Sequence, residues 1–488
     1  MNDVTATYDL VIFGAKGDLA CRKLLPALYQ LEKNEKLAKN MKIIGVGRAL
    51  WNKQDYLEII RKSLKKFMHE EIQENIWKTF SLRFEFCNLD INDTKNFIKL
   101  KKMFYDKKKL IIHYFAMPQN TFSKICKGLK YIHLNLEPTR VIIEKPLGSS
   151  LKTSQKINSG ISKYFKENQI FRIDHYLGKE TILNLLAFRF SNSLFYYNWN
   201  RNFIDHVQIT ISESIGIEGR KEYFDNAGQI RDMVQNHMLQ ILTIITMSEP
   251  INLYSNSIKN EKIKILQALR PFTHKNIYEN VVLGQYSSNI VNGNKISSYL
   301  EDIGTNISSN TETFVSMKVN IDNKQWSGVP FYLRTGKRMP KKHSEIVISF
   351  KDISTNIFNK NSPYLSKNKV IIFLQPNEGI NIQILNKVPN LEHKYKLDTI
   401  NLNFHYDQHF KSLKLFDAYE KLLLEGIRGN HSLFVRRDEI ELAWSWIDSI
   451  FDSIKHNKKL LFLYPSGTLG PHASKNIIEK DGYTWNEF

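Results

Sequence analysis

The sequence contains few cysteines and no long apolar run. Three of its 488 residues are cysteines, Cys21, Cys87 and Cys126, and their wide spacing fits neither a zinc site nor a disulfide framework. The longest apolar run is LQILTIITM, which is far shorter than the ~20 residues that a membrane-spanning helix needs. The first residues, MNDVTATYDLVIFGA, lack the charged start and long apolar core of a signal peptide. These absences predict a cytoplasmic protein that binds neither metal nor membrane.

Acidic residues are scarce relative to basic ones. Lysine and arginine number 69 against 49 aspartates and glutamates, which gives a formal net charge of +20. A nucleic-acid groove would gather arginine into a strip with aromatic residues between the charges. Here lysines are instead scattered through segments such as RKSLKK and LKKMFYDKKK. The composition therefore argues against nucleic acid as a partner and favours a solvated surface that suits anionic substrates.

The first third of the chain alternates strands and helices. Strands are expected in YDLVIFG, MKIIGVG, LRFEFCNLD, LIIHYFAM and TRVIIEKP, with a helical stretch from Asn52 to Leu82 between the second and the third. Strands separated by helix-length pieces predict βαβ units and a doubly wound parallel sheet.

The pattern changes at about Phe203. From there, strands such as IDHVQITISES, EIVISF and KVIIFLQP follow one another with short connections, which is typical of an antiparallel sheet. We therefore expect an α/β domain at 1–175 that binds the nucleotide. A larger α+β domain at 176–488 would bind substrate and form oligomers, with the substrate cleft between the two domains.

The segment VIFGAKGDLA places Gly14 and Gly17 between the first strand and the first helix. Glycines there permit a tight turn and let backbone N–H groups approach a pyrophosphate. The spacing G-x-x-G-x-x-A departs from the standard fingerprint, and an ordinary glycine turn is the alternative. The second strand, IIGVGR, ends in Arg48, where an enzyme for unphosphorylated NAD would carry an acid. Because arginine accommodates a 2′-phosphate, the sequence predicts a Rossmann-type domain for NADP.

Two charged motifs follow later strands. RVIIEKPLG places Lys145 at the carboxyl end of a parallel strand, where ligands bind in α/β sheets, although a solvated surface lysine would fit the same spacing. FRIDHYLGKE crowds Asp174, His175, Tyr176 and Lys179 around one glycine. An acid, an imidazole, a phenol and an ammonium together suit a phosphorylated ligand beside a group that transfers a proton.

The segment AGQIRDMVQNHMLQILTIITM is expected to form one long helix, because its apolar residues recur at helical spacing. His237 falls on the apolar stripe, so both a core histidine and a catalytic base are open. Asp232 would lie about 140° around an α-helix from His237, so periodicity does not bring both to one ligand. A carboxylate such as Asp174 could hold the imidazole in one tautomer and stabilise its protonated form.

Five motifs occur in the order typical of one enzyme family. GAKGDLA, EKPLG, RIDHYLGKE, IRDMVQNHMLQ and PFYLRTGKRMP together resemble bacterial glucose-6-phosphate dehydrogenase, the first enzyme of the pentose phosphate pathway. The resemblance covers essentially the whole chain, and RIDHYLGKE is its most specific part. It implies oxidation of D-glucose 6-phosphate at C1 to 6-phosphoglucono-1,5-lactone, with hydride transfer to NADP. It also implies a homodimer or homotetramer built through the large sheet.

The resemblance assigns roles to individual residues. It implies that His237 removes the C1 hydroxyl proton, that Asp174 supports the imidazolium, and that Lys145 touches both cofactor and sugar. The other implied substrate ligands are His175, Tyr176 and Lys179 for the phosphate, Glu213 and Asp232 for sugar hydroxyls, and Lys337, Lys342 and Gln375 to complete the pocket. The implied cofactor ligands are Gly14, Ala15, Lys16, Gly17, Asp18, Leu19, Ala20, Cys21, Arg48, Tyr114 and Lys145.

The sequence departs from the family's pattern at three positions. Lys16 replaces the small residue of many members and could add a phosphate contact. Phe373 stands where some animal members use arginine to hold a second, structural NADP, and Leu469 stands where close bacterial relatives often have tryptophan. The runner-up function is another NAD(P)-dependent sugar oxidoreductase with an E-K-P lysine, which would not need the DHYLGKE cluster. A non-catalytic basic binding protein is the alternative from a different class.

Overall fold

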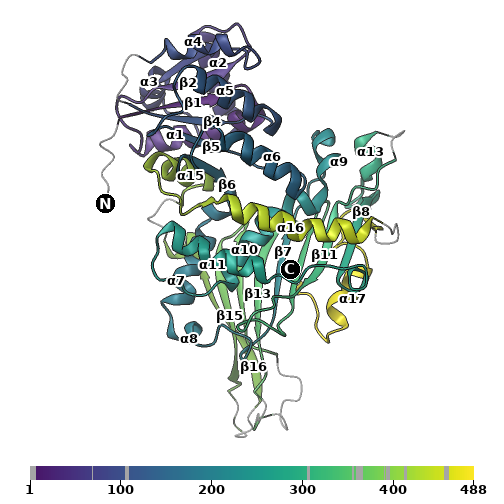
Figure 1. Ribbon diagram of the computed structural model, residues 1–488. Helices are drawn as coiled ribbons and strands as arrows, with labels where there is room; N and C mark the ends of the chain where they lie inside the picture. Colours follow the sequence, from purple (N-terminus) through teal and green to yellow (C-terminus); the bar gives the residue numbers. More distant parts are fainter. Residues whose placement is uncertain are drawn as a thin grey trace. The chain divides into compact units, whose positions relative to one another are not determined.

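The protein forms two compact units (Figure 1). The first comprises Met1–Gly178, Pro250–Asn260 and Phe416–Glu441, and the second Lys179–Glu249, Glu261–Leu415 and Leu442–Phe488. The predicted roles of 1–175 and 176–488 stay predictions. The structure is a computed structural model that describes residues 7–68, 70–104, 109–304, 308–353, 357–358, 366–389, 391, 396–410, 415–455 and 461–487.

Within the described residues, the first unit is built on a seven-stranded sheet in the order β17-β6-β5-β4-β1-β2-β3. Strands β1 to β6 pair in parallel, and β17 joins antiparallel to β6. Leu10 and Ile12 belong to a core shared with the first helices, whereas Phe13 stacks on Phe97 on the opposite face. The strands are β1 (Tyr8–Phe13), β2 (Ile43–Gly47), β3 (Phe84–Asn88), β4 (Leu110–Phe115), β5 (Arg140–Ile143), β6 (Ile170–Ile173) and β17 (Phe434–Val435).

The described part of the second unit contains a nine-stranded sheet in the order β16-β15-β14-β13-β7-β12-β11-β8-β18. Strands β7 and β12 pair in parallel, as do β8 and β18, and the other neighbours pair antiparallel. The strands are β7 (Ile204–Ser212), β8 (Val281–Ser287), β11 (Phe314–Val319), β12 (Phe331–Gly336), β13 (His343–Phe350), β14 (Lys369–Gln375), β15 (Gly379–Lys387), β16 (Leu397–His405) and β18 (Leu461–Pro465). The predicted fold class, a doubly wound parallel sheet followed by a mainly antiparallel one, is confirmed.

Helices complete both units. Those of the first unit include η1 (Ala20–Leu24), α1 (Leu25–Lys33), α2 (Lys53–Phe67), α3 (Glu74–Leu82), α4 (Phe97–Lys101), α5 (Phe122–Tyr131), α6 (Leu151–Ser162), η5 (His175–Gly178) and α15 (Ala418–Arg428). Those of the second include α7 (Glu180–Phe190), α9 (Lys221–Gln229), η6 (Ile230–Met238), α10 (Leu239–Thr246), α13 (Tyr299–Ile303) and α17 (Ala473–Glu479). The unit boundary divides α11 (Ser255–Ala268) and α16 (Arg437–Ile454).

Two helix predictions were wrong in detail. The stretch expected to be helical from Asn52 to Leu82 forms two helices, because the chain becomes extended at Met68 after α2. The expected single helix around His237 is three successive segments, α9, η6 and α10. Gly228 interrupts the first of them with a φ of +69°, which residues with a side chain rarely adopt.

Several strands escaped prediction. The sequences of β8 (VVLGQYS) and β16 (LDTINLNFH) mix apolar residues with glycine, glutamine or asparagine, which have low strand propensity. Cross-strand side chains compensate in β16, where the amide groups of Asn401 and Asn403 accept hydrogen bonds from Asn381 on β15. Among the described residues, no helix is both long and apolar enough to cross a membrane.

Candidate active site

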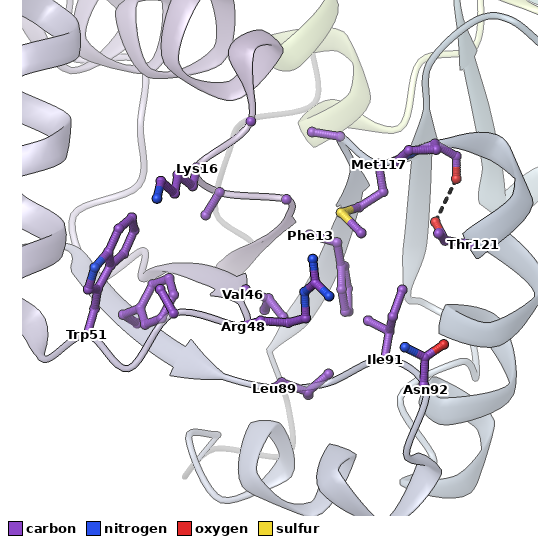
Figure 2. Close-up of a pocket in the computed structure, with 18 of the residues that line it drawn as sticks. Phe13, Lys16, Val46, Arg48, Trp51, Leu89, Ile91, Asn92, Met117 and Thr121 are labelled. Carbon is purple, nitrogen blue, oxygen red and sulfur yellow. Dashed lines mark hydrogen bonds between the residues drawn. The ribbon is translucent and has the colours of Figure 1, made fainter. Parts of the chain in front are cut away.

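A cavity of about 930 Å³ opens at the carboxyl ends of the parallel strands of the first unit (Figure 2). Its lining comes from the loops after β1, β2, β3 and β4, and β1 has the later strand β4 on one side and β2 on the other. Nucleotides bind at such a reversal of strand order. The volume falls within the range of ordinary ligand pockets.

Backbone geometry shapes the turn after β1. Gly14 has a φ of +87°, and its N–H donates to the Val46 carbonyl at 3.0 Å. A Cβ atom at this position would collide with the Ala116 carbonyl of the neighbouring loop, so a glycine is required. The Gly17 N–H donates to the Gly14 carbonyl at 2.8 Å and closes the turn. The first half of the predicted glycine motif, Gly14 to Gly17, therefore lines the cavity.

Two cations line this cavity. The Lys16 ammonium lies 5.3 Å from the centre of the Trp51 ring, and Figure 2 shows the Arg48 guanidinium directed into the cavity. Asn88 at the end of β3 donates hydrogen bonds to the carbonyls of Arg48 and Ala49, which fixes the loop that carries Arg48. Ammonium and guanidinium groups make charge-assisted contacts to phosphate groups, so both cations suit a phosphorylated ligand.

Not every predicted cofactor residue lies on the cavity wall. Gly14, Ala15, Lys16, Gly17 and Arg48 line it. Tyr114 is instead fully buried within β4. The described residues that do not contribute to the lining, although they were predicted to contact the cofactor, are Asp18, Leu19, Ala20, Cys21, Tyr114 and Lys145.

Tyr114 contacts an acid that the sequence analysis did not single out. Its hydroxyl donates to the Glu144 carboxylate at 2.5 Å, and Tyr419 of α15 hydrogen-bonds to the same carboxylate. Burial raises the pKa of Glu144 to about 7, although the hydrogen bonds and the adjacent Lys145 ammonium act in the opposite direction. Lys145 thus follows directly after a carboxyl group that two phenols hold in place.

The DHYLGKE segment begins in the first unit, where β6 ends. Asp174 is buried, and its carboxylate accepts the Tyr176 N–H at 3.0 Å, which closes the turn into η5. The His175 ring stacks on Tyr419, and Gly178 packs directly on the backbone of α15. The structure therefore groups Asp174, His175 and Tyr176 in one unit. Lys179 is the first residue of the other, and its ammonium donates to the Leu374 carbonyl there at 3.3 Å.

His237 lies on η6 in the second unit and is buried. This segment is π-helical: the Leu239 N–H, for example, donates to the Val234 carbonyl five residues earlier. In such a helix residues i and i+5 lie on the same side. The expectation that Asp232 and His237 point about 140° apart assumed an α-helix, and it was wrong for this reason. The Asp232 carboxylate accepts a hydrogen bond from Tyr223 at 3.1 Å.

Two predicted sugar ligands form an ion pair in the same unit. The buried Lys337 ammonium lies 2.8 Å from the Glu213 carboxylate, just beyond the ends of β12 and β7. Lys342 is exposed ahead of β13. Gln375 is the last residue of β14, and its side-chain amide donates a hydrogen bond to the Ser344 hydroxyl on β13. The structure thus joins Glu213 with Lys337.

Comparison with known proteins decides the family. Residues 11–184 match the model of the glucose-6-phosphate dehydrogenase NAD binding domain, and residues 186–486 match the model of the C-terminal domain of the same enzyme. The chain belongs to the glucose-6-phosphate dehydrogenase family. The family predicted from the five motifs is confirmed, and the runner-up, another sugar oxidoreductase, is not supported.

Relatives in the glucose-6-phosphate dehydrogenase family match along the full chain. A glucose-6-phosphate 1-dehydrogenase of Buchnera aphidicola subsp. Baizongia pistaciae is 64% identical over 490 residues, covering 100% of both chains. The enzyme of Dickeya dadantii is 53% identical over 98% of both chains. A solved glucose-6-phosphate dehydrogenase in complex with its substrate glucose-6-phosphate aligns with a TM-score of 0.89 at 32% identity over 99% of both chains.

The family motifs do not reveal every residue that shapes these sites. The sequence analysis did not single out three residues that contact predicted site residues: Trp51 beside Lys16, Glu144 beside Tyr114, and Tyr419 beside His175. Glu144 stands within the quoted EKP motif, so its position beside Lys145 could have marked it. Tyr419 lies far along the chain in α15, and nothing in the sequence pairs it with β5.

We predict that Glu144→Gln changes the pH dependence of stability. Because the folded-state pKa of Glu144 is about 7 and the unfolded value is about 4.3, its stabilising contribution is complete below about pH 4.3 and is lost as the pH rises to about 7. The free energy of unfolding of the wild type should therefore fall relative to Glu144→Gln by about 1.4 kcal/mol per pH unit in this window. Chemical unfolding of both proteins at a series of pH values measures this. A constant difference across the window would contradict the assignment.

Proposed function

We propose that the protein oxidises D-glucose 6-phosphate at C1 to 6-phosphoglucono-1,5-lactone and transfers the hydride to NADP. This is the first step of the oxidative pentose phosphate pathway. The observation that carries the proposal is the match of almost the whole chain to the two domains of this enzyme family. The cavity at the ends of the parallel strands supports the nucleotide part of the reaction.

In the proposed reaction, His237 acts as the general base. Its neutral imidazole removes the C1 hydroxyl proton while the C1 hydride leaves for the nicotinamide, and Asp174 stabilises the resulting imidazolium. An imidazole with a reference pKa of ~6.5 suits this step at cellular pH. The burial of His237 and Asp174 supports the proposal, because a buried base is shielded from solvent protons.

The sugar phosphate is proposed to bind through the charged and polar side chains of the DHYLGKE motif. His175, Tyr176 and Lys179 would hold the phosphate. The other proposed contacts are Lys145 between sugar and cofactor, Glu213 and Asp232 at the sugar hydroxyls, and Lys337, Lys342 and Gln375 around them. The Lys337–Glu213 ion pair supports this in part, because it holds a donor and an acceptor next to each other as adjacent hydroxyls require.

NADP is the proposed cofactor. Gly14 and Gly17 would bring backbone N–H groups to the pyrophosphate, Arg48 would hold the 2′-phosphate of the adenosine, and Lys16 would add a phosphate contact. The placement of both cations on the cavity wall supports this assignment. NADP supplies the hydride acceptor, and the residues of this chain bind and orient it.

We further infer a homodimer or homotetramer built through the large sheet. The exposed side chains of Ile400 and Leu402 on β16, at one edge of this sheet, support the inference, because exposed apolar residues at a sheet edge favour association. A cytoplasmic location is supported by Cys21, Cys87 and Cys126, which are free thiols as in a reducing compartment.

An absorbance assay tests the proposed function. Purified protein is mixed with glucose 6-phosphate or unphosphorylated glucose, and with NADP or NAD, and the absorbance of the reduced nicotinamide is followed. Rapid reduction of NADP with glucose 6-phosphate and slow reduction with glucose is the expected result. The absence of any absorbance change with sugar phosphates would favour a non-catalytic binding protein.

We predict that Arg48→Ala weakens the use of NADP and spares the use of NAD. A charge-assisted contact to a phosphate is worth about 1.5–3 kcal/mol, so the KM for NADP should rise roughly 10- to 100-fold while that for NAD changes little. Steady-state kinetics with both cofactors measure this, and Lys53→Ala, at an exposed lysine nearby, serves as the control. Equal changes in both KM values would show that Arg48 does not read the 2′-phosphate.

We predict that His237→Asn lowers kcat by roughly 10²–10⁴, the usual effect of losing a general base. The KM for glucose 6-phosphate and the melting temperature should stay near the wild-type values, because asparagine keeps a polar side chain on η6. Kinetics and thermal unfolding of the same preparation measure all three quantities. If His237 is only a core residue, the melting temperature falls and kcat of the folded protein is retained.

A further inference from the structure

Glu312 and Thr313 directly precede β11 and are buried. They contact the start of η6 and the backbone of Lys337. The Glu312 carboxylate accepts the Ile230 N–H at 3.1 Å, and the Glu312 carbonyl accepts the Gln229 N–H at 2.9 Å. The first N–H groups of a helix have no partner within the helix. Glu312 therefore satisfies two such donors at the start of η6.

The backbone at Gly228, just before η6, packs closely against the Glu312 carboxylate. A Cβ atom on Gly228 would collide with the Glu312 carboxylate, so the glycine before η6 leaves the space that the acid fills. The buried side-chain amide of Gln229 donates to Thr335 on β12 at 2.9 Å. The start of η6 is thus attached both to Glu312 and to the strand that ends beside Lys337.

Thr313 holds the other functional element. Its carbonyl accepts the Lys337 N–H at 2.9 Å, and its hydroxyl lies 3.1 Å from the Tyr464 hydroxyl. Tyr464 in turn donates to the Lys337 carbonyl at 2.6 Å. Two consecutive residues therefore connect the helix that carries His237 to the backbone of Lys337, whose ammonium pairs with Glu213.

A buried carboxylate is a costly way to cap a helix. Burial raises the pKa of Glu312, and the Ile230 N–H and the charge of Arg231 counteract the rise. An exposed serine or aspartate would cap a helix without this cost. A buried acid at this place links the start of η6 to a chain segment 82 residues later, next to the backbone of Lys337. The helix start therefore has a defined position relative to Lys337.

We propose that Glu312 is a positioning residue of this enzyme, whose carboxylate fixes the start of η6 and so sets the place of His237 relative to the Lys337–Glu213 pair. This inference rests on the proposed function, in which His237 is the base and Lys337 and Glu213 bind the sugar. A shift of about 1 Å in a reacting group can reduce turnover about a hundredfold.

Three variants test the role of the carboxylate. Glu312→Ala removes the acceptor for the Ile230 N–H, Glu312→Asp withdraws it by one methylene, and Glu312→Gln keeps an acceptor of the same length. The matched control is Trp326→Phe, which removes a buried hydrogen bond of 2.7 Å to the Thr246 carbonyl at the far end of α10. The measured quantities are kcat, the KM values for glucose 6-phosphate and NADP, and the melting temperature.

The expected results separate positioning from stability. Glu312→Ala should lower kcat about tenfold to a hundredfold with the KM for NADP unchanged, Glu312→Asp should lie between, and Glu312→Gln should restore kcat. Trp326→Phe should lower the melting temperature and leave kcat unchanged. If Glu312→Ala does not fold, the comparison of kcat between Glu312→Asp and Glu312→Gln tests the positioning role.

Two results would overturn the inference. One is a lower melting temperature in Glu312→Ala, or in Glu312→Asp, with a wild-type kcat in the folded protein. The other is an equal loss of kcat in Trp326→Phe, which would mean that any weakening of this helical run slows the reaction. A failure of the proposed function is distinct, because the wild type would then not reduce NADP with glucose 6-phosphate. A failure of the proposed role of His237 would appear as an unchanged kcat in His237→Asn.

Discussion

The Ile230 N–H donates a hydrogen bond to the buried Glu312 carboxylate at the start of η6, the helix of the second unit that carries the proposed base His237. Its first N–H groups are buried, so an acceptor has to come from a distant part of the chain. From that start the π-helical pattern brings Asp232 and His237 onto one side. The position of the candidate base therefore depends on a loop before β11, and the large sheet contributes by holding that loop.

Buried acids lie next to proposed site residues in both units. Glu144 precedes Lys145 and accepts a hydrogen bond from the Tyr114 hydroxyl. Glu312 accepts a hydrogen bond from the backbone of the helix that carries His237. Burying a carboxyl group is unfavourable unless donors satisfy it, and each of these acids has such donors. In return, a fully bonded buried acid allows few alternative positions for its neighbours. At the cavity of the first unit, backbone hydrogen bonds from Gly14 to Val46 and from Gly17 to Gly14 hold the turn instead.

The sequence predicted those features that local chemistry determines. Gly14 and Arg48 follow strands of a parallel sheet, and the carboxyl ends of such strands meet at one edge, so both could be placed at a nucleotide cavity. The π-helical pattern of η6 could not be predicted, because it depends on contacts with residues far away in sequence. The hydrogen bond from Tyr114 to Glu144 could not be predicted either, because the alternation of side chains along a strand does not show which residue a buried side chain contacts. Roles inferred from the family, such as that of Lys179, stay predictions.

The proposed chemistry depends on proton removal by His237 with the support of Asp174. The pH dependence of kcat/KM for glucose 6-phosphate, measured for the wild type and for Asp174→Asn, tests it most directly. We expect kcat/KM of the wild type to fall on the acidic side as the imidazole becomes protonated. In Asp174→Asn this acidic limb should move to lower pH, because a neutral amide no longer stabilises the imidazolium, and the maximal rate should fall. An acidic limb at the same pH in both proteins would contradict the pairing of His237 with Asp174.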